Sequence, residues 1–460
     1  MNNFWDFSVW GWFNVLAVLL ISLLVAKVLK KIIPILNASL IPTSVLGGAI
    51  LLVVAGIFKA ITGNVMFDTA FFGDHGTTTL EIITYHCLAL GFVASTLKSS
   101  GGKLSKKRTI EIFNTGVTTV STYLLQGILG LGITMVVALL VKDFFGAAGL
   151  LLPFGYGQGT GQAMNYGNIY EQDFGFIGGK SFGLTIAALG FLSASLGGVA
   201  HLYLLRKRGQ ILDRGSGDGA IEAAAIQQEG EIPMQESMDK ITVQLALIAL
   251  AYFVAQLLMI ILGKILPGMK SVIYGFNFLL GVAAATIVKA ILNLLNRKGL
   301  VRRRHTNDFL LTRCSNFFYD LMVVAGVAAI RLGILESYWG IMLILGVVGL
   351  VSTYFYNLFV AKKLFPDYPQ EQFLMMYGML TGTASTGVIL LREIDGDFKT
   401  PAADNMVYQN LPAIVFGFPI MLLATLAPVK TELTLILLVA FFLVMNLILF
   451  RSFIFKRKKK

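Results

Sequence analysis

Long apolar runs alternate with short polar connections along almost all of the 460-residue chain. A membrane-spanning helix needs about 20 mostly apolar residues to cross roughly 30 Å of hydrocarbon. Eleven segments reach or approach this length, namely residues 9–26, 38–58, 80–97, 112–141, 181–205, 241–263, 271–295, 309–330, 337–361, 406–429 and 433–450. The pattern predicts an all-α polytopic membrane protein with about 11 spans.

Two further apolar stretches, residues 147–170 and 373–391, are rich in glycine, threonine and serine. We interpret them as re-entrant loops that enter and leave the membrane on one side. The polar connections then alternate strictly, and one side receives 28 of the 37 lysines and arginines while the other receives seven. By the positive-inside rule the richer side is cytoplasmic, which predicts an outside N-terminus and an inside C-terminus.

The two halves of the chain resemble each other. Residues 45–48 (VLGG) recur as residues 279–282 (LLGV), residues 88–94 recur as residues 323–329, and Gly159-Thr160 pairs with Gly382-Thr383. Each half contributes five spans, and because five is odd, the second copy is inverted, as in secondary transporters. The predicted units are a first repeat at 1–205, a cytoplasmic linker at 206–240, a second repeat at 241–430, and an extra helix with a basic tail at 431–460.

Composition excludes several classes of function. The chain is 56% hydrophobic and 13% charged, whereas soluble domains carry about 25% charged residues. The net charge of +12 is spread in short clusters between apolar spans, so it predicts no nucleic-acid partner. Only Cys87 and Cys314 are present, too few for a cysteine-ligated zinc site. No catalytic pair stands out, so we expect neither an enzyme nor a cofactor.

The first re-entrant stretch carries glycine at four alternate positions from 155 to 161. Glycine lets the backbone turn sharply and approach a ligand, and backbone left unpaired at membrane depth is tolerated only in a protein-lined or water-filled site. Half-helix N-termini suit anionic groups, and freed carbonyls suit sodium. The predicted substrate-binding residues here are Gly155, Gly157, Gln158, Gly159, Thr160, Gly161, Gln162 and Asn165. The alternative is that the glycines only let helices pack closely.

The second re-entrant stretch has fewer glycines but more hydroxyl groups. It adds Thr383, Ser385 and the nearby Arg392 to the predicted substrate site, and the predicted ion ligands are Thr160, Thr381, Gly382, Thr383, Ser385, Thr386 and the mid-span Asp320. The hydroxyl groups could instead bond within their own helix. An ionisable group inside a span is a functional candidate by default, but Asp320 and His86, at the matching place in the first half, could equally be packing residues.

These segments resemble the bacterial sodium/glutamate symporter family. The resemblance is carried by residues 41–48 (IPTSVLGG), by the loop at 157–163 (GQGTGQA) and by the run at 165–175, and it extends over nearly the whole chain. It implies a homodimer in a bacterial cytoplasmic membrane, in which a mobile part carries both re-entrant loops and couples sodium entry to glutamate uptake.

The chain also departs from the family pattern. Gly155-Tyr156-Gly157 stands where the family usually has a Gly-Gly doublet, and residues 381–387 are richer in hydroxyl groups. The prediction is therefore a divergent member that binds sodium and a small anionic or zwitterionic substrate, either glutamate or a related amino acid or carboxylate. The rival predictions are an ion channel and a membrane-embedded enzyme.

Overall fold

The computed structural model describes residues 3–98, 105–209, 231–234, 237–267, 270–275, 277–300, 303–331, 333, 338–395 and 399–454. Most of the predicted linker and the basic end of the tail lie outside these residues. Helices dominate the described part, and the β-pairing seen there is an isolated bridge between Glu231 and Arg304. The predicted all-helical class is confirmed.

The first half of the chain forms a series of helices with two short 3-10 segments in one long connection. In chain order they are α1 (Phe7–Ile32), α2 (Pro34–Ala38), α3 (Thr43–Thr62), η1 (Met66–Asp68), η2 (Ala70–Phe72), α4 (Gly76–Leu97), α5 (Lys106–Leu140), η3 (Gly146–Leu150), α6 (Leu151–Phe174) and α7 (Gly179–Lys207).

The second half contains a further series of long helices and several short ones. Its elements are α9 (Lys240–Ile265), α10 (Lys270–Gly275), α11 (Asn277–Arg297), α12 (Asp308–Ala328), α13 (Trp339–Leu364), α14 (Pro369–Thr381), α15 (Ala384–Arg392), α16 (Ala402–Tyr408), α17 (Asn410–Leu426), α18 (Thr431–Leu449) and α19 (Arg451–Ile454).

Helix ends follow local sequence signals. The Ser105 side chain accepts a hydrogen bond from the backbone N–H of Arg108 at 3.3 Å, and Asn307 caps α12 in the same way at 2.7 Å. These bonds satisfy N–H groups that a helix start leaves unpaired. Two other helices end at glycines with positive φ, α3 at Gly63 and α6 at Gly175, where a residue with a Cβ would be strained.

Nine helices of the described part are long and apolar enough to cross a membrane, and the bent pair α16 and α17 makes a possible tenth. These account for ten of the eleven predicted spans. The remaining one, 309–330, forms the 21-residue helix α12, which carries Arg313, Asn316 and Asp320 and is too polar to pass as a plain apolar span. The polytopic membrane class is thus confirmed.

Helices of the two halves pack against each other reciprocally. Helix α3 packs on α12 while α11 packs on α4, and α4 and α12 lie against each other. Glycines mark both contacts: a Cβ at Gly48 would lie 3.0 Å from the Val324 oxygen, and one at Gly281 would lie 3.0 Å from Cγ2 of Val93. Small residues of this kind let membrane helices approach closely.

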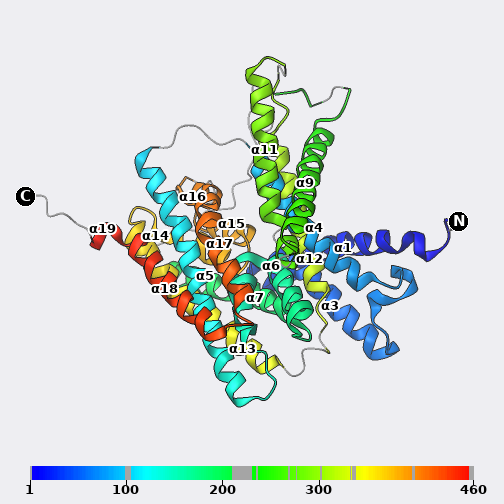
Figure 1. The fold of residues 1–460 in the computed structure, drawn as a ribbon, viewed down its shortest axis with the longest axis horizontal. Helices are drawn as coiled ribbons and strands as arrows, with labels where there is room; N and C mark the ends of the chain where they lie inside the picture. The colour runs from blue at the N-terminus through cyan, green and yellow to red at the C-terminus, as the bar shows by residue number, and fades with distance from the viewer. Residues whose placement is uncertain are drawn as a thin grey trace, which may run out of the picture.

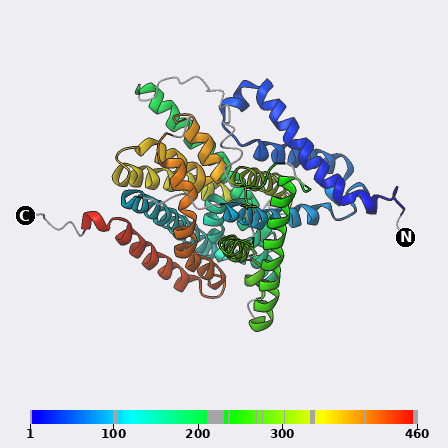
Figure 2. The same ribbon diagram turned by 90° about the horizontal axis from the view of Figure 1, so that it is seen from above.

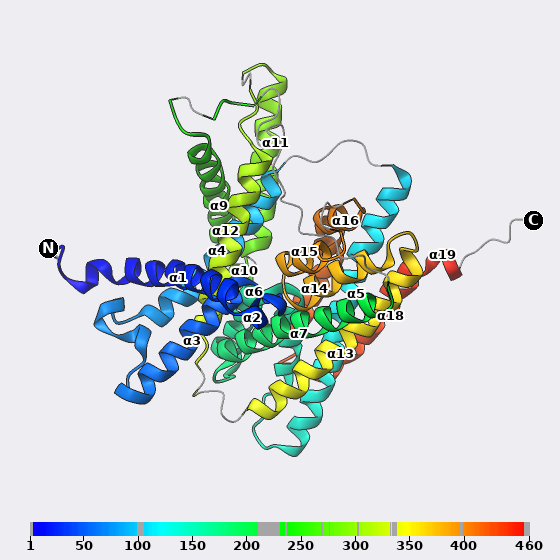
Figure 3. The same ribbon diagram turned by 180° about the vertical axis from the view of Figure 1, so that it is seen from behind.

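Helix α6 lies near the centre of the molecule, with α1 and α3 on one flank and α18 on the opposite flank (Figures 1 and 2). Seen from behind, α9, α11 and α12 stand together, apart from the group of α14, α15 and α16 (Figure 3). The four fully buried tyrosines of the described residues, Tyr156, Tyr166, Tyr170 and Tyr377, belong to α6 and α14. The two glycine-rich stretches therefore lie in the core.

Candidate functional site at two helical hairpins

Helix α6 folds back on itself at Gly159. This glycine has φ 80° and ψ −172°, and it is the residue inside α6 whose backbone is not helical. The rings of Phe154 and Tyr166 stack with centroids 3.9 Å apart, whereas a straight helix would separate these residues by about 18 Å. Phe145 before α6 also stacks on Phe176 after it, at 4.7 Å. Residues 151–174 therefore form a hairpin, hairpin 1, whose two ends lie together.

Helices α14 and α15 form a second hairpin, hairpin 2, at residues 369–392. A Cβ on Gly378 would lie 2.8 Å from the Cα of Gly387, so the two arms touch through glycines. Beyond hairpin 2, Asn405 donates hydrogen bonds to the hydroxyl of Tyr368 at 2.9 Å and to Oε1 of Gln372 at 3.1 Å. The chain thus returns to the point where hairpin 2 began.

The tips of the two hairpins meet. A Cβ built on Gly159 would lie 3.5 Å from Cγ2 of Thr383 and 3.8 Å from the oxygen of Gly382. Thr160 is fully buried, and its hydroxyl donates to the Met322 oxygen of α12 at 3.4 Å. The two Gly-Thr pairs that the sequence matched between its halves therefore both lie at hairpin tips, next to each other.

The four alternate glycines play different roles. Gly155, Gly157 and Gly161 are helical, and each faces a close neighbour that would collide with a Cβ: the backbone of Ala187 on α7, the ring of Tyr123 on α5, and Leu88 on α4. Only Gly159 has the positive φ that breaks the helix. The alternative explanation, that the glycines let helices pack closely, therefore holds for three of the four, and the prediction of a sharp backbone turn holds for Gly159.

Uncharged polar groups surround the tip of hairpin 1. Gln162 is 1% exposed, and its amide nitrogen has no hydrogen-bond partner within the described structure. Asn165 donates to the Gly275 oxygen of α10 at 3.2 Å and contacts Oε1 of Gln162 at 3.5 Å. Gln158 is half-buried. The free amide of Gln162 can donate to a carboxylate.

The hydroxyl groups of hairpin 2 are partly used within the hairpin. The Thr381 hydroxyl donates to the Tyr377 oxygen at 2.6 Å, which is the helical back-bonding that was the alternative explanation. The hydroxyls of Thr383 and Thr386 lie 3.4 Å apart. The side chain of Ser385 lies outside the described part of the structure. Thr383 is half-buried at the tip, where its methyl group faces Gly159 of hairpin 1.

Two predicted charged residues do not lie at the tips. Arg392 is exposed at the far end of α15, about 12 Å of helix from its start. Asp320 is also exposed, lies near Ser44 of α3, and lies on the opposite face of α12 from Met322. His86 forms a 2.8 Å hydrogen bond with the Tyr252 hydroxyl. The structure thus joins Gly159, Thr160, Gly382 and Thr383 without these charges.

Helices α5 and α7 supply residues that sequence reasoning missed. The Tyr123 hydroxyl donates to the Gly157 oxygen at 3.0 Å, and the Gln126 amide donates to the Leu380 oxygen at 3.0 Å, so α5 binds both hairpins. On α7, Ser193 hydrogen-bonds with the Tyr156 hydroxyl, and its carbonyl accepts from Tyr377. A signal was present in the run of hydroxyl residues at 115–122, unusual inside an apolar span.

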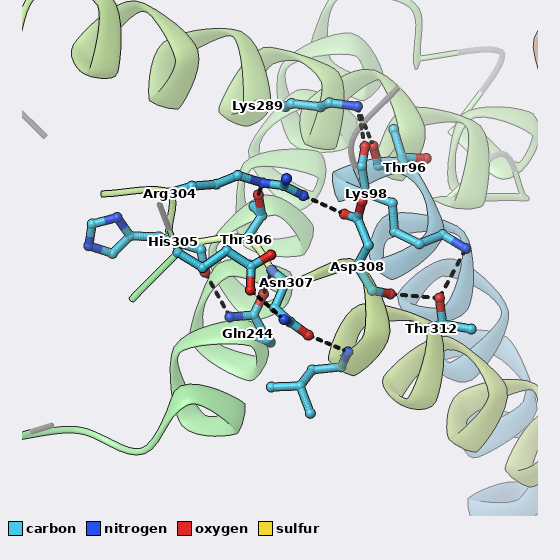
Figure 4. Close-up of polar contacts among 12 residues, drawn as sticks. Thr96, Lys98, Gln244, Lys289, Arg304, His305, Thr306, Asn307, Asp308 and Thr312 are labelled. Carbon is cyan, nitrogen blue, oxygen red and sulfur yellow. Dashed lines mark hydrogen bonds and ion pairs between the residues drawn. The ribbon is translucent and has the colours of Figure 1, made fainter. Parts of the chain in front are cut away.

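A second polar cluster joins the ends of α4, α9, α11 and α12 (Figure 4). Lys289 donates to the carbonyl oxygens of Thr96 and Lys98, and Arg304 pairs with Asp308 at 2.8 Å. Burial lowers the pKa of Lys98, an effect that the nearby Asp308 opposes. These charged residues link the helices at the end where the predicted cytoplasmic connections lie. We therefore assign them a structural role.

Charged metal-binding groups are not gathered in the described residues, where no three His, Cys, Asp or Glu side chains cluster. The hairpin tips offer backbone carbonyls, backbone N–H groups and threonine hydroxyls instead. Such neutral oxygens bind a hard monovalent cation, and helix N-termini bind anions.

Apolar helices around two central broken helices define a polytopic membrane protein of the kind that secondary transporters form. The chain belongs to the sodium/glutamate symporter family, whose sequence profile matches residues 11–370. This membership confirms the resemblance seen in the sequence and makes the protein a sodium-coupled transporter. The match ends at the start of α14, so nearly all of hairpin 2 lies beyond it. A search of curated proteins found no match.

Proposed function

We propose that the protein takes up glutamate, or a related amino acid or carboxylate, together with sodium by alternating access. The observation that carries this proposal is the meeting of the two hairpin tips, Gly159-Thr160 from one half of the chain and Gly382-Thr383 from the other. In secondary transporters, broken helices at the interface of two repeats form the binding site for substrate and coupling ion.

The tips supply N–H groups that can bind an anion and oxygen atoms that can bind a cation. The second arm of hairpin 1 starts after Gly159 and α15 starts at Ala384, and both helix starts present N–H groups to an anion. The unpaired amide nitrogen of Gln162 adds a donor. The Gly382 oxygen and the hydroxyl groups of Thr160 and Thr383 are the proposed sodium ligands. Because Arg392 lies elsewhere, helix starts and amides would hold the substrate carboxylates.

The proposed architecture is two inverted repeats with re-entrant hairpins, in a homodimer with the N-terminus outside a bacterial cytoplasmic membrane. The reciprocal packing of α3 on α12 and of α11 on α4 supports the repeat, because an inverted two-fold relation exchanges these pairs. The returning ends of both hairpins support re-entrance. Membership of the family supports the membrane and the dimer.

The rival functions fit these features less well. Channel filters usually come from several identical copies around an axis, whereas here the two tips come from one chain. An enzyme would need reacting side chains at the tips, and the groups that meet there are glycines and threonines held among uncharged neighbours.

Uptake into proteoliposomes tests the proposal. Purified protein in vesicles with an inward sodium gradient should accumulate radiolabelled glutamate, or another acidic or neutral amino acid or small carboxylate. Collapse of the gradient with a sodium ionophore should stop accumulation, and a potassium gradient should not replace it. Substrate uptake that does not depend on the sodium gradient would refute sodium symport. Uptake that does not saturate for any of these compounds would refute it as well.

A further inference from the structure

Two short segments of matching sequence lie on α5 and α13. Residues 121–126 read STYLLQ and residues 352–357 read STYFYN, so each has Ser-Thr-Tyr followed by a side-chain amide at the sixth position. We name them the α5 motif and the α13 motif. The two motifs are closer together along the chain than the matched segments at 88–94 and 323–329, and farther apart than the matched pairs at 159–160 and 382–383. This spacing indicates that the motifs are corresponding parts of the two halves.

The two motifs bind each other reciprocally. Gln126 of the α5 motif donates through its amide nitrogen to the Thr353 hydroxyl at 2.8 Å, and Asn357 of the α13 motif donates to the Thr122 hydroxyl at 3.3 Å. Each amide and threonine are four residues apart, hence on one face of their helix. All four side chains are at most 1% exposed.

Both amide orientations are set by acceptors that cannot donate. The Gln126 nitrogen also bonds the Leu380 oxygen at 3.0 Å, and the Asn357 nitrogen bonds the Thr353 oxygen at 2.9 Å. A backbone carbonyl only accepts, so an NH₂ group must face it. The remaining amide oxygens, Oε1 of Gln126 and Oδ1 of Asn357, are buried and have no hydrogen-bond partner in the described residues.

Two unpaired buried oxygens at one helix contact are costly, because each has lost its bonds to water. Each oxygen shares its amide carbon with the nitrogen that bonds the opposite threonine, so each lies within a few Å of that hydroxyl. A hard cation takes oxygen ligands at roughly 2.3 to 2.6 Å, and two of its ligands therefore lie within about 5 Å of each other. The reciprocal hydrogen bonds place each amide beside the threonine of the opposite helix, as a shared ligand shell requires.

We propose that the α5 and α13 motifs hold a dehydrated sodium ion, bound by the amide oxygens of Gln126 and Asn357 and by the hydroxyls of Thr122 and Thr353. This site is separate from the hairpin tips. The choice of sodium, rather than another monovalent cation, rests on the proposed function. Neutral oxygens fit a singly charged ion, since charged ligands would be needed to hold a divalent one tightly.

Two residues of the α5 motif, one of them a proposed ligand, connect this site to both hairpins. Gln126 binds the Leu380 oxygen of hairpin 2, and Tyr123 of the α5 motif binds the Gly157 oxygen of hairpin 1. An ion that orders the two amides would therefore also steady the two tips. Sodium bound here would favour the arrangement in which Gly159 and Thr383 are together, and so would raise substrate affinity through linkage.

The test is a sodium titration of the unfolding temperature of the full-length chain in detergent, at constant ionic strength with choline as the balancing cation. Gln126→Met and Asn357→Leu keep the side-chain volume and remove the proposed ligands. Each should raise the half-saturating sodium concentration about tenfold relative to wild type. Potassium should have little effect on any of them.

Gln372→Met is the matched control. Gln372 is also 0% exposed and also binds a threonine of α5, Thr115, at 3.1 Å, but its oxygen is occupied by Asn405. It should leave the half-saturating sodium concentration unchanged. If Gln126→Met does not fold, Gln126→Glu replaces it, and the added carboxylate should lower the half-saturating concentration.

Equal sodium dependence in wild type, Gln126→Met, Asn357→Leu and the control would overturn the site, as would an unchanged or raised value in Gln126→Glu. Sodium-driven uptake by the wild-type protein is measured in parallel. Uptake that persists while the motif variants bind sodium normally would leave symport standing and move the ion elsewhere. Absence of sodium-driven uptake would instead refute the proposed function itself.

Discussion

The backbone conformation at position 159 favours glycine, whereas the neighbouring atoms leave room for a larger side chain. An added Cβ would meet no atom closer than 3.5 Å, yet φ is 80°. Gly159→Ala should therefore cost on the order of 1 kcal/mol of unfolding free energy through strain alone. If the tip is the binding site, it should also weaken both sodium and substrate binding, because one backbone serves both.

Gly175 provides the control for this prediction. It has φ 72° and open space around it, but it lies at the end of hairpin 1 away from the tip. Gly175→Ala should match the loss of stability and leave both affinities unchanged, as measured by thermal unfolding and by equilibrium binding. If Gly159→Ala and Gly175→Ala bind sodium and substrate with the same affinities, the ligands bind away from Gly159.

The two tip threonines allow a sharper test of the shared site. Thr160→Val and Thr383→Val keep the shape and remove one hydroxyl each. A lost ligand or hydrogen bond should cost roughly 1 to 3 kcal/mol, or about 5- to 150-fold in affinity. The double variant should deviate from additivity, because Thr383 lies against the backbone of Gly159 and Thr160 follows it. Additive effects in a double-mutant cycle on sodium binding would mean that the two threonines act at separate sites.

At this scale the sequence predicted that the two Gly-Thr pairs correspond, and the structure brings these pairs together, but the sequence did not predict the role of each glycine. The Gly-Thr pairs at 159–160 and 382–383 could be matched because similar letters recur at similar spacing. Which glycine breaks the helix could not be read, because Gly155, Gly157 and Gly161 differ from Gly159 only through neighbours on α4, α5 and α7. Those contacts join residues far apart in the chain.

Hairpin 1 is positioned among its neighbouring elements by buried tyrosine hydroxyls. Tyr156 bonds the Ser193 hydroxyl of α7 at 2.8 Å and the Gly346 oxygen of α13 at 2.6 Å. Tyr156→Phe removes both bonds without changing the ring, and it should lower the unfolding free energy by about 1 to 2 kcal/mol. Tyr203→Phe, on an exposed position of α7, is the comparison and should change little. Equal losses of stability in Tyr156→Phe and Tyr203→Phe, measured by thermal unfolding, would contradict this role of the Tyr156 hydroxyl.

The helices themselves were largely predictable, and their ends were not. Hydropathy located the apolar part of α5 at 112–141, but the helix starts at Lys106 because Ser105 caps a charged first turn. The predicted span 271–295 is divided between α10 and α11. The α5 and α13 motifs could not be recognised from the sequence, because a match of six residues is too short to be distinctive without the contact between their helices.

At the scale of the whole molecule, the number of residues between matched segments of the two halves changes along the chain. Gly48 contacts α12 and Gly281 contacts α4, although Gly281 matches Gly47 in the repeated segments. The inverted repeat stays a prediction, which the reciprocal packing of α3 on α12 and of α11 on α4 favours. The charge bias that oriented the chain is a separate kind of observation, because it concerns loops and says nothing of packing. It leads to its own prediction.

The predicted orientation can be tested by labelling introduced cysteines in intact cells. Cys87 and Cys314 are both buried and are first replaced by alanine. Cysteines at Asn64 and Lys142, exposed residues of connections predicted to lie outside, should react with a membrane-impermeant thiol reagent. Neither position has a left-handed backbone, unlike the adjacent Asp143 with φ 63°, so the substitution adds no strain there.

Cysteines at Asp218 and Lys458, which lie outside the described residues, should stay unlabelled until the membrane is permeabilised. If both hairpins are re-entrant, as proposed, Asn64, Lys142 and Asp218 keep the sides that strict alternation assigns. Were hairpin 1 to cross completely, every later connection would change sides and Asp218 would be labelled from outside. Were only hairpin 2 to cross, Asp218 would stay protected and Lys458 would react. The pattern of labelling thus tests each hairpin separately, whatever substrate the protein carries.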